Sequence, residues 1–572
     1  MSKGMAEPRA AKQPGLLELA AHPIVLVGVI ALAGVIIRLR GISWGLPYVY
    51  DPDEHFLVDP AVRFVTTGDL NPHWFAYPAS TIMYTLGVVF LAYWLVGHGV
   101  GWFPDLHSFG TLFLTDPTSF YLIARVVAVA LSVLAIPLTY VLCRRMAGKG
   151  ASLAAAMFVA VSPLHAEFSR VVRTDPLMTA LILAAMFYAV KGMEDRFSRN
   201  FLLSGIFVGL ATATKFPGMS GAMIVVLAAV LAKPQPPVQG VTRLRWLGAA
   251  FAGGLVGFFA AAPFVVSGVR EVYWTLFTEA THTHLSATGT RGVSNYLWYV
   301  KGPLRDAVGW PLELAAVIGF VACWSGWRRP RMLLASFSIL FLLGIGLSLK
   351  RWDRWIVPLM PFVAILAAVG LETLVRCVAR RRWRPSLQDA TVAALGIALV
   401  LPTAIEAYQR GGTIEDTRDI AKIWIEQHIP RGSKIAVEQN TPPISRDEYQ
   451  VFVVVPGGLQ RDTSTRGFKG VLGDMGTLDP LRGRAIEYVL LSSYFDRFQA
   501  EGKRYPDEVR FYEHLLAGSH MLYELSPTGR TKGPVIRVLK LGSEMLEGAG
   551  CRRSGAPKEG YSCAPVSAPP FS

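Results

Sequence analysis

Apolar residues in this chain are grouped in long runs that short polar segments separate. A membrane-spanning helix needs about 20 mostly apolar residues, within a range of about 17–25. Eleven runs reach or approach that length, and we expect each to cross a membrane. They are residues 23–39, 119–143, 151–167, 176–191, 201–214, 216–232, 246–267, 308–327, 332–349, 356–375 and 389–408. The pattern therefore predicts an α-helical polytopic membrane protein with a transmembrane domain over residues 23–408.

A further apolar run, residues 79–97, is expected not to cross the membrane. Lys and Arg are enriched in the cytoplasmic loops of membrane proteins. The five basic loops lie on one side only if residues 79–97 form a re-entrant or interfacial helix inside a long outer loop, residues 40–118. These loops are residues 144–149, 191–199, 233–245, 328–331 and 376–384. The arrangement places residues 1–22 in the cytoplasm and the C-terminal part outside it.

The sequence changes character after Tyr408. Apolar spacing predicts helices over Thr417–Ile429 and Arg504–Leu516, and short β-rich segments alternate with them. These segments are residues 434–438, 449–455, 488–492 and 535–541. Because such alternation is typical of α/β domains, we expect a small extracytoplasmic α/β domain over residues 409–546. Residues 547–572 are rich in Gly, Ser, Pro and Ala, which predicts a flexible tail.

Composition and charge agree with a membrane protein. Hydrophobic residues make up 52% of the chain and charged residues 17%, against about 25% charged in soluble domains. The net charge of +15 would raise the question of nucleic acid in a soluble protein. Here the basic residues lie in loops between apolar runs, so we attribute them to topology and expect no nucleic-acid partner.

The five cysteines fit the same sidedness. Cys143, Cys323 and Cys377 fall at cytoplasmic helix ends, where thiols stay reduced. Cys551 and Cys563 lie in the outer tail, where they form either a disulfide or two free thiols.

Three carboxylates, Asp51, Asp53 and Glu54, follow the first span within four residues. Asp51 precedes Pro52 and stands three residues before Glu54, which is the pattern of a helix N-cap with a capping box. We therefore assign Asp51 to a cap. Asp53 is not needed for that cap, and a carboxylate facing a water-excluding membrane surface suits a general base.

Cationic side chains also gather on the outer side, where the positive-inside bias disfavours them. An anionic ligand such as a phosphate explains them; the alternatives are pairing with nearby acids and snorkelling to lipid headgroups. They are Arg173, Lys215, Arg351 and Arg354. Ionisable groups are expected in these outer loops and helix ends rather than inside the spans.

Histidines and aromatic residues of the outer loops suit contacts with a sugar or acceptor, and an interfacial aromatic belt is the alternative. The candidates are His55, Tyr77, His282, His284 and Tyr296. His282 and His284 have no apparent third ligand, so we expect no metal site and no required cofactor; nothing supports a divalent cation.

The order of these motifs resembles the bacterial GT-C glycosyltransferases of the protein-O-mannosyltransferase-like, or aminoarabinose-transferase-like, superfamily (glycosyltransferase family 39-like). An Asp-Glu pair follows the first span, an aromatic-Tyr-Pro segment opens a juxtamembrane helix, and Arg-x-x-Arg-Thr-Asp follows the third span. A Thr-Lys pair separates two short spans, and Lys-Arg-x-x-Arg-Trp precedes a late span. The resemblance covers roughly residues 20–545.

The resemblance implies an enzyme of the bacterial inner membrane that transfers a hexose or pentose, with inversion, from a polyprenyl-phosphate donor to an extracytoplasmic protein, lipid or glycan. Asp53 would deprotonate the acceptor with Glu54 beside it, and Asp175 matches a second family acid. The lipid phosphate would contact Lys215, Arg351 and Arg354, with Arg173 nearby.

Two features depart from the family pattern. Trp355 stands where the family commonly has a tyrosine, and the segment Tyr77-Pro78-Ala79 lacks the lysine of a Lys-Pro-Pro phosphate contact, which argues against the aminoarabinose activity. The alternatives are a transporter or flippase of lipid-linked glycans and a non-catalytic scaffold for the outer domain. An outer cavity joining Asp53 to Lys215 and Arg354 favours the enzyme, whereas a charge-lined path through the midplane favours transport.

Overall fold

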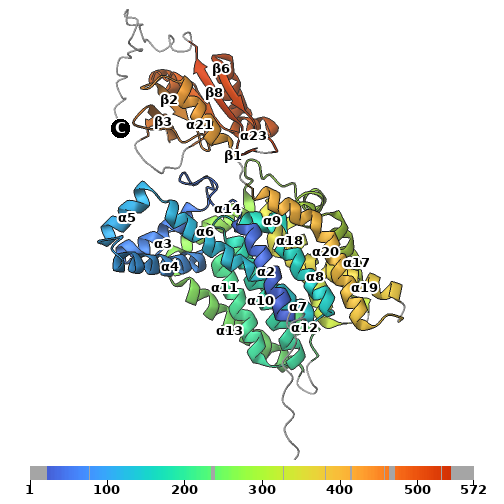
Figure 1. Cartoon of the computed structure of the whole chain (residues 1–572). Coiled ribbons are helices and arrows are strands. Elements are labelled where there is room, and N and C mark those ends of the chain that lie inside the picture. The colour runs from blue at the N-terminus through green and yellow to red at the C-terminus, as the bar shows by residue number, and fades with distance from the viewer. Residues whose placement is uncertain are drawn as a thin grey trace, which may run out of the picture.

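The computed structural model describes residues 22–542 except residues 77, 234–238, 326–327, 380–381, 413–414, 456–457, 463–469 and 530. Figure 1 shows two parts: a helical bundle up to α20 and a sheet-containing region that follows it. The expected flexible tail and the cysteines at positions 551 and 563 lie outside the described residues, whereas Cys143, Cys323 and Cys377 are free thiols.

The helical bundle is built from the apolar runs. Its helices are α2 (Pro23–Leu39), α3 (His55–Thr67), α4 (Ser80–Gly99), α5 (Leu106–Thr115), α6 (Thr118–Val133), α7 (Ala135–Arg144), α8 (Lys149–Ala160), α9 (Pro163–Ser169), α10 (Thr174–Asp195), α11 (Ser198–Thr214), α12 (Gly221–Leu231), α13 (Gln239–Ala261), α14 (Val269–Thr281), α15 (Val293–Tyr299), α16 (Arg305–Val308), α17 (Trp310–Ala322), α18 (Arg329–Gly346), α19 (Met360–Ala379) and α20 (Pro385–Arg410). Short 3-10 or π turns are η1 (Phe216–Ser220), η2 (Pro263–Gly268), η3 (Val300–Leu304) and η5 (Asp353–Leu359).

The chain is a multi-pass integral membrane protein. Seven helical segments of the described residues are long and apolar enough to cross a membrane, and eight if α8 and α9, bent by 53°, form one span. The apolar helices α2 and α17 and the segment Phe216–Leu231 are shorter than this criterion requires. Length and composition therefore support seven or eight crossings among the described residues, and the rest of the expected eleven crossings stay a prediction.

The run 79–97 forms α4, which is itself long and apolar enough to span. Figure 1 shows α3 and α4 side by side and crosswise to α2 and α10. The two helices share an apolar core in which Val58 and Ala61 of α3 contact residues such as Met83 and Leu86 of α4. This direction supports an interfacial helix, although composition alone would allow α4 to cross.

Small residues let the spanning helices approach closely. A Cβ atom added to Gly205 of α11 would lie 1.9 Å from the carbonyl oxygen of Ala250 in α13, and one added to Gly209 would lie 2.2 Å from that of Gly254. Because lipid is as apolar as a leucine side chain, such backbone packing is a main source of helix association in membranes. This packing fixes the position of α11, which ends at Thr214, directly before Lys215.

The C-terminal region is an α/β unit with a mixed sheet in the order β4-β3-β2-β5-β8-β6. Its strands are β1 (Glu415–Asp416), β2 (Lys434–Val437), β3 (Gln450–Val455), β4 (Gly458–Arg461), β5 (Tyr488–Leu491), β6 (Ser519–Leu525), β7 (Thr531–Lys532) and β8 (Ile536–Leu541). Its helical segments are α21 (Thr417–His428), η6 (Leu472–Met475), α22 (Asp479–Gly483), α23 (Tyr494–Ala500) and α24 (Pro506–Ala517). The strands β3, β2 and β5 are parallel, and the remaining pairings of this sheet are antiparallel.

The two predicted helices and four predicted strands of this region are confirmed as α21, α24, β2, β3, β5 and β8. Ile425 of α21 packs on Ile435 and Val437 of β2, and Phe511 of α24 lies in the other core, so a helix covers each face. Sequence inspection missed the edge strands β4 and β6, because neither is a buried apolar run: β4 ends in exposed polar residues, and β6 mixes polar residues with the exposed Met521 and Leu522.

The sidedness predicted from the basic loops can be measured by cysteine labelling in a background without the native cysteines. We expect Thr67→Cys and Lys503→Cys to react with an impermeant maleimide on intact spheroplasts, and Arg199→Cys to react only after permeabilisation. The physical reason is the retention of basic loops in the cytoplasm. Labelling of Lys503→Cys only after permeabilisation would contradict the eleven-span topology.

Candidate functional site

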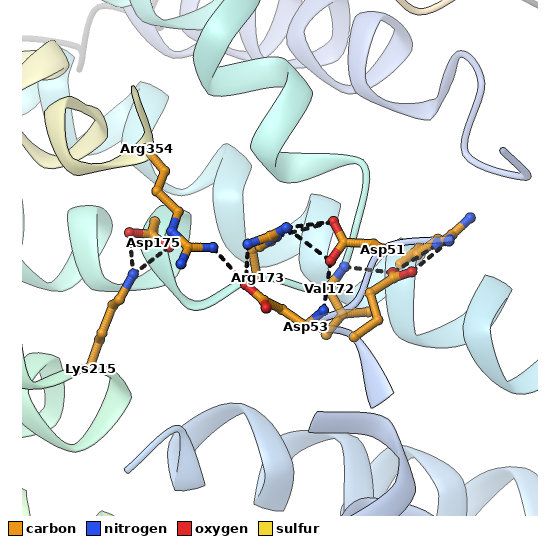
Figure 2. Close-up of polar contacts among 9 residues, drawn as sticks. Asp51, Asp53, Val172, Arg173, Asp175, Lys215 and Arg354 are labelled. Carbon is orange, nitrogen blue, oxygen red and sulfur yellow. Dashed lines mark hydrogen bonds and ion pairs between the residues drawn. The ribbon is translucent and has the colours of Figure 1, made fainter. Parts of the chain in front are cut away.

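Arg173, the residue before α10, binds two carboxylates from the loop that precedes α3. Its Nη2 donates to Asp51 Oδ2 at 2.7 Å, and its Nη1 donates to Asp53 Oδ2. Arg354, in η5, donates from Nη1 to the same Oδ2 of Asp53 at 2.6 Å. Asp53 therefore lies between two arginines that belong to segments far apart in the sequence (Figure 2).

A second ion pair continues this row of alternating charges (Figure 2). Lys215, which follows α11, donates from Nζ to both oxygens of Asp175 at 2.8 and 3.0 Å. Asp175 is in the first turn of α10, two residues after Arg173. The side chains of Lys215 and Asp175 are both buried. Because Arg173 and Asp175 are two residues apart, the start of α10 sets the distance between the two ion pairs.

Glu54 lies apart from the other three carboxylates of this row. Both of its oxygens accept from Arg125 of α6, at 2.6 and 2.8 Å, and one also accepts from the Val172 amide at 2.8 Å. Both charged side chains are fully buried, and Arg125 also donates to the carbonyls of Ile42 and Trp44. Glu54 thus anchors the segment after the first span to α6, and its predicted catalytic role has no support from this geometry.

Exposure and charge distinguish Asp53 from its neighbours. Its side chain is 36% exposed, against 9% for Asp51 and 0% for Glu54. Burial by itself raises the pKa of Asp53, but the charges of Arg173 and Arg354 outweigh burial and hold that pKa below its usual range. Burial raises the pKa of Glu54. Asp53 is therefore an ionised carboxylate at neutral pH, with its Oδ2 occupied by guanidinium groups.

The capping role expected for Asp51 is wrong. The helix α3 begins at His55, not at Pro52, and its N-cap residue Glu54 makes no capping hydrogen bond. Asp51 accepts from the amide of Asp53 at 2.9 Å and from Arg173. The sequence pattern of a capping box was present, but the ion pair with Arg173 takes the carboxylate instead.

Arg354 enters the row of charges, whereas Arg351 does not. The guanidinium of Arg351 lies 5.2 Å from the ring centroid of Trp298, and Lys350 pairs with Glu279 at 3.0 Å. The structure therefore brings together Arg173, Lys215 and Arg354 from the predicted phosphate contacts, and leaves Arg351 outside.

The predicted sugar contacts are scattered. His55 is exposed at the start of α3, and His284 packs against Trp352, with ring centroids 5.0 Å apart. His282 is exposed beside Thr281, and Tyr296 donates to the Leu343 carbonyl at 3.3 Å. Tyr77 lies outside the described residues. The described residues contain no group of three or more His, Cys, Asp or Glu side chains that could hold a metal ion.

A small cavity of about 30 Å³ joins the two ends of the row of charges. Asp53, Asp175, Lys215 and Arg354 line it, together with the indole of Trp74. The sequence interpretation expected a cavity that joins Asp53 to Lys215 and Arg354, and all three residues line this one. Its volume suits a water molecule rather than a sugar phosphate, so lining side chains must move when a larger ligand binds.

Sequence inspection missed Arg125, the partner of Glu54. We expected charges only in loops and at outer helix ends, but Arg125 lies inside the predicted span 119–143, in its first half. The signal was available: Arg125 is the lone charge in that run, and an ionisable residue within a span is rare and usually paired.

The chain combines a helical membrane bundle, an ion-pair cluster and a C-terminal α/β region, and two comparisons show which known proteins it is similar to. Residues 113–266 match the sequence model of a family described as dolichyl-phosphate-mannose-protein mannosyltransferase. No curated protein matches the chain. The predicted resemblance to membrane glycosyltransferases of this family is confirmed over the matched residues, which include Arg173, Asp175 and Lys215 but neither Asp53 nor Arg354.

Solved structures share the fold across nearly the whole chain. ArnT from Cupriavidus metallidurans in the apo state has 16% sequence identity and a TM-score of 0.50, covering 90% of this chain and 97% of its own. The same enzyme bound to undecaprenyl phosphate gives the same identity and score, with 91% and 98% covered. The Archaeoglobus fulgidus oligosaccharyltransferase in the apo form has 11% identity and a TM-score of 0.50, with 91% and 75% covered. At these identities the similarity establishes the fold.

The pair of Glu54 and Arg125 predicts a large effect on stability. Arg125→Met leaves a buried carboxylate without its partner, which costs about 3–5 kcal/mol. We expect a marked fall in the thermal unfolding midpoint of the purified protein in detergent. The control is Arg145→Met, which breaks a partly exposed pair with Glu194 and should cost at most about 1 kcal/mol. Equal midpoints for the two variants would contradict the anchoring role.

Proposed function

We propose that this chain is a glycosyltransferase that moves a sugar from a polyprenyl-phosphate donor to an extracytoplasmic acceptor, with inversion. The observation that carries the proposal is the cavity shared by one half-exposed carboxylate, Asp53, and two cations, Lys215 and Arg354. Inverting transfer needs one base for the acceptor and positive charge for a phosphate leaving group. The family match and the fold shared with ArnT support this reaction class.

The two cations suit the phosphate of the donor. Lys215 approaches the cavity from the end of α11 and Arg354 from η5, so they can hold a phosphate from two directions. Guanidinium groups can bind two phosphate oxygens at once, whereas an ammonium acts as a point charge. Because a lipid phosphate is already a good leaving group, charge stabilisation replaces a strong general acid.

Asp53 suits the acceptor base, and the donor itself would activate it. With both arginines on Oδ2, the carboxylate is stabilised and therefore weakly basic. A donor phosphate that draws Arg354 toward itself removes one of these charges, which raises the basicity of Asp53. Proton abstraction then becomes effective only when the donor is in place. Arg173 stays between Asp51 and Asp53 and keeps the carboxylate in position.

A transporter or flippase is the alternative, and the placement of charges favours the enzyme. Transporters usually place ionisable groups and broken helices near the midplane of the membrane. Apart from Arg125, which pairs with Glu54 from inside α6, the ion pairs of the described bundle gather toward helix ends. Asp53 and Lys215 mark the proposed outer end, and Arg331 with Glu372, beside the basic loops, marks the other.

The proposed setting is a bacterial inner membrane, with eleven crossings, a cytoplasmic N-terminus and the C-terminal region outside. The cluster then faces the compartment in which polyprenyl-linked sugars and envelope acceptors meet. No cofactor is required by this chemistry, because the leaving group is a phosphate and the base is a carboxylate.

Replacing the base tests the function directly. Asp53→Asn should abolish the glycan change that the gene produces, because a positioned general base typically contributes about 10²–10⁴-fold to the rate. Mass spectrometry compares envelope glycans and glycoproteins from cells without the gene and from cells complemented with wild type or variant. Asp69→Asn, a charge removal in the same outer loop, should restore the wild-type pattern. Identical glycans with and without the gene would refute a transferase.

The low pKa of Asp53 predicts the pH dependence of transfer. Since Arg354 lowers that pKa, Arg354→Met should raise it, and the acidic limb of the rate profile should move to higher pH. Labelled sugar transfer in membrane preparations measures this limb, normalised to each variant's maximum. Arg351→Met removes the neighbouring charge that contacts Trp298, and its limb should stay in place. If the acidic limb of the Arg354→Met rate profile lies at the same pH as that of wild type, Asp53 is not the titrating base.

A further inference from the structure

The C-terminal α/β unit contacts the helical bundle in two separate places, and each contact holds a chain segment that leads to one partner of the Asp53–Arg354 ion pair. The start of α21 contacts the loop before Asp53. The turn between α23 and α24 contacts a loop that pairs with the segment before Arg354. The ion pair therefore joins two segments that are both attached to the same unit.

The first contact centres on Tyr50, three residues before Asp53. Its hydroxyl donates to Asp419, and the guanidinium of Arg418 lies 3.6 Å from the centre of its ring. Arg418 is held in turn by Asp416, the N-cap residue of α21, at 2.8 Å, and both of these side chains are buried. The first turn of α21 thus fixes the loop that carries the proposed base.

The second contact centres on Glu501, in the turn between α23 and α24. Its Oε1 accepts from the amide of Ser286 at 3.0 Å, and its Oε2 accepts from Thr288 Oγ1 at 2.7 Å. Leu285, the residue before Ser286, packs against the apolar core that α24 shares with the sheet. A carboxylate of the unit and an apolar side chain of the loop therefore hold the two together.

The loop that this carboxylate holds is paired with the segment that leads to Arg354. Thr288 and Lys350 form an antiparallel bridge, and the amide of Arg351 donates to the Ala287 carbonyl at 2.7 Å. Arg354 follows three residues later, in the first turn of η5. Because these backbone pairs join the two segments directly, the position of the loop constrains the position of η5.

The two contacts belong to one rigid body. The helix α21 packs on one face of the sheet through Ile425, and α24 packs on the other face through Phe511. The strands β2 and β5 pair between these two apolar cores. Packed protein interiors have low compressibility and transmit a displacement instead of absorbing it. The fold of the unit therefore fixes the distance between its two contacts.

Both segments also border a larger cavity, of about 300 Å³, beside the ion pair. Trp44 and Asp51 line it from the loop after α2, and Asp353 and Arg354 line it from η5. Lys532 of the α/β unit completes this part of the wall. The unit and the two segments that it holds thus converge next to the proposed site.

We propose that the α/β unit is a clamp that sets the contact between Asp53 and Arg354, with Tyr50 and Glu501 as its positioning residues. The inference rests on the proposed function, in which Asp53 is the base and Arg354 holds the donor phosphate. Arg354 then turns its side chain toward the donor while its backbone stays in place. The separation of base and phosphate matters for the rate, since a misplacement of about 1 Å can slow a reaction by about 100-fold.

Hydrogen exchange of the purified full-length protein in detergent tests the clamp without requiring transfer. Glu501→Ala should speed amide exchange over residues 284–292 and 346–354 by about 10-fold, because it removes a hydrogen-bond acceptor and frees the paired segments. Glu501→Gln should restore the wild-type rate, since its carbonyl oxygen still accepts and its amide can donate to Thr288 Oγ1. Glu513→Ala removes an exposed acid of α24 and is the matched control, with unchanged exchange expected.

The pH profile of labelled sugar transfer in membrane preparations shows whether the clamp sets the ion pair. At low substrate concentration the profile reports the free protein, in which Arg354 helps to hold the pKa of Asp53 below its usual range. A loosened contact raises that pKa, so the acidic limb in Glu501→Ala and in Tyr50→Phe should move to higher pH, toward its place in Arg354→Met. A role in folding alone lowers the rate by one factor at every pH and leaves the limb in place.

The two measurements separate the possible failures. Exchange in Glu501→Ala that equals wild type would overturn the clamp. Faster exchange with an unmoved acidic limb would overturn it as well, because the unit would then hold the segments without setting the ion pair. Absence of transfer by wild type at every pH would refute the proposed function instead, and hydrogen exchange would still decide whether the unit holds the two segments.

Discussion

Neutralisation of charge in a confined space is the constraint on which this site depends. Four carboxylates and four cations are paired there: Asp51, Asp53, Glu54 and Asp175 against Arg125, Arg173, Lys215 and Arg354. Removing one partner of a buried pair leaves the other charge uncompensated, at a cost of several kcal/mol. The ion pairs therefore tie the loop after α2 to α6, to the start of α10 and to η5, and they tie the end of α11 to α10, so they fix the geometry of the cluster.

The same pairing gives the proposed reaction its order. The cations that would hold a donor phosphate are already bound to carboxylates, so the phosphate has to compete for them. When it draws Arg354 away from Asp53, the carboxylate loses a stabilising charge and becomes a stronger base. A site whose charges are paired at rest thus gains its base only when the donor is bound.

Arg173 and Arg354 separate two compartments of different character. Asp53 and Lys215 line the small cavity, and seven Lys or Arg residues line the larger one, including Lys532 of the C-terminal region. The C-terminal region contacts Tyr50 through Asp419 and contributes Lys532 to the wall of the larger cavity. A bundle that ended at α20 would leave that wall open.

The sequence alone determined the helical membrane class, the α/β character of the C-terminal region and most of the cluster. Apolar runs and strand patterns are local signals. The cations Arg173, Lys215 and Arg354 stood out on the side where few are expected, Asp53 stood out as an acid not needed for a cap, and the family resemblance pointed to Asp175. Tertiary structure decided the partners. Whether Asp51 caps a helix or binds Arg173, and whether Arg351 or Arg354 meets Asp53, depends on how distant helix ends converge. The larger cavity was also invisible in the sequence, because its lining residues come from separate segments that only tertiary packing brings together.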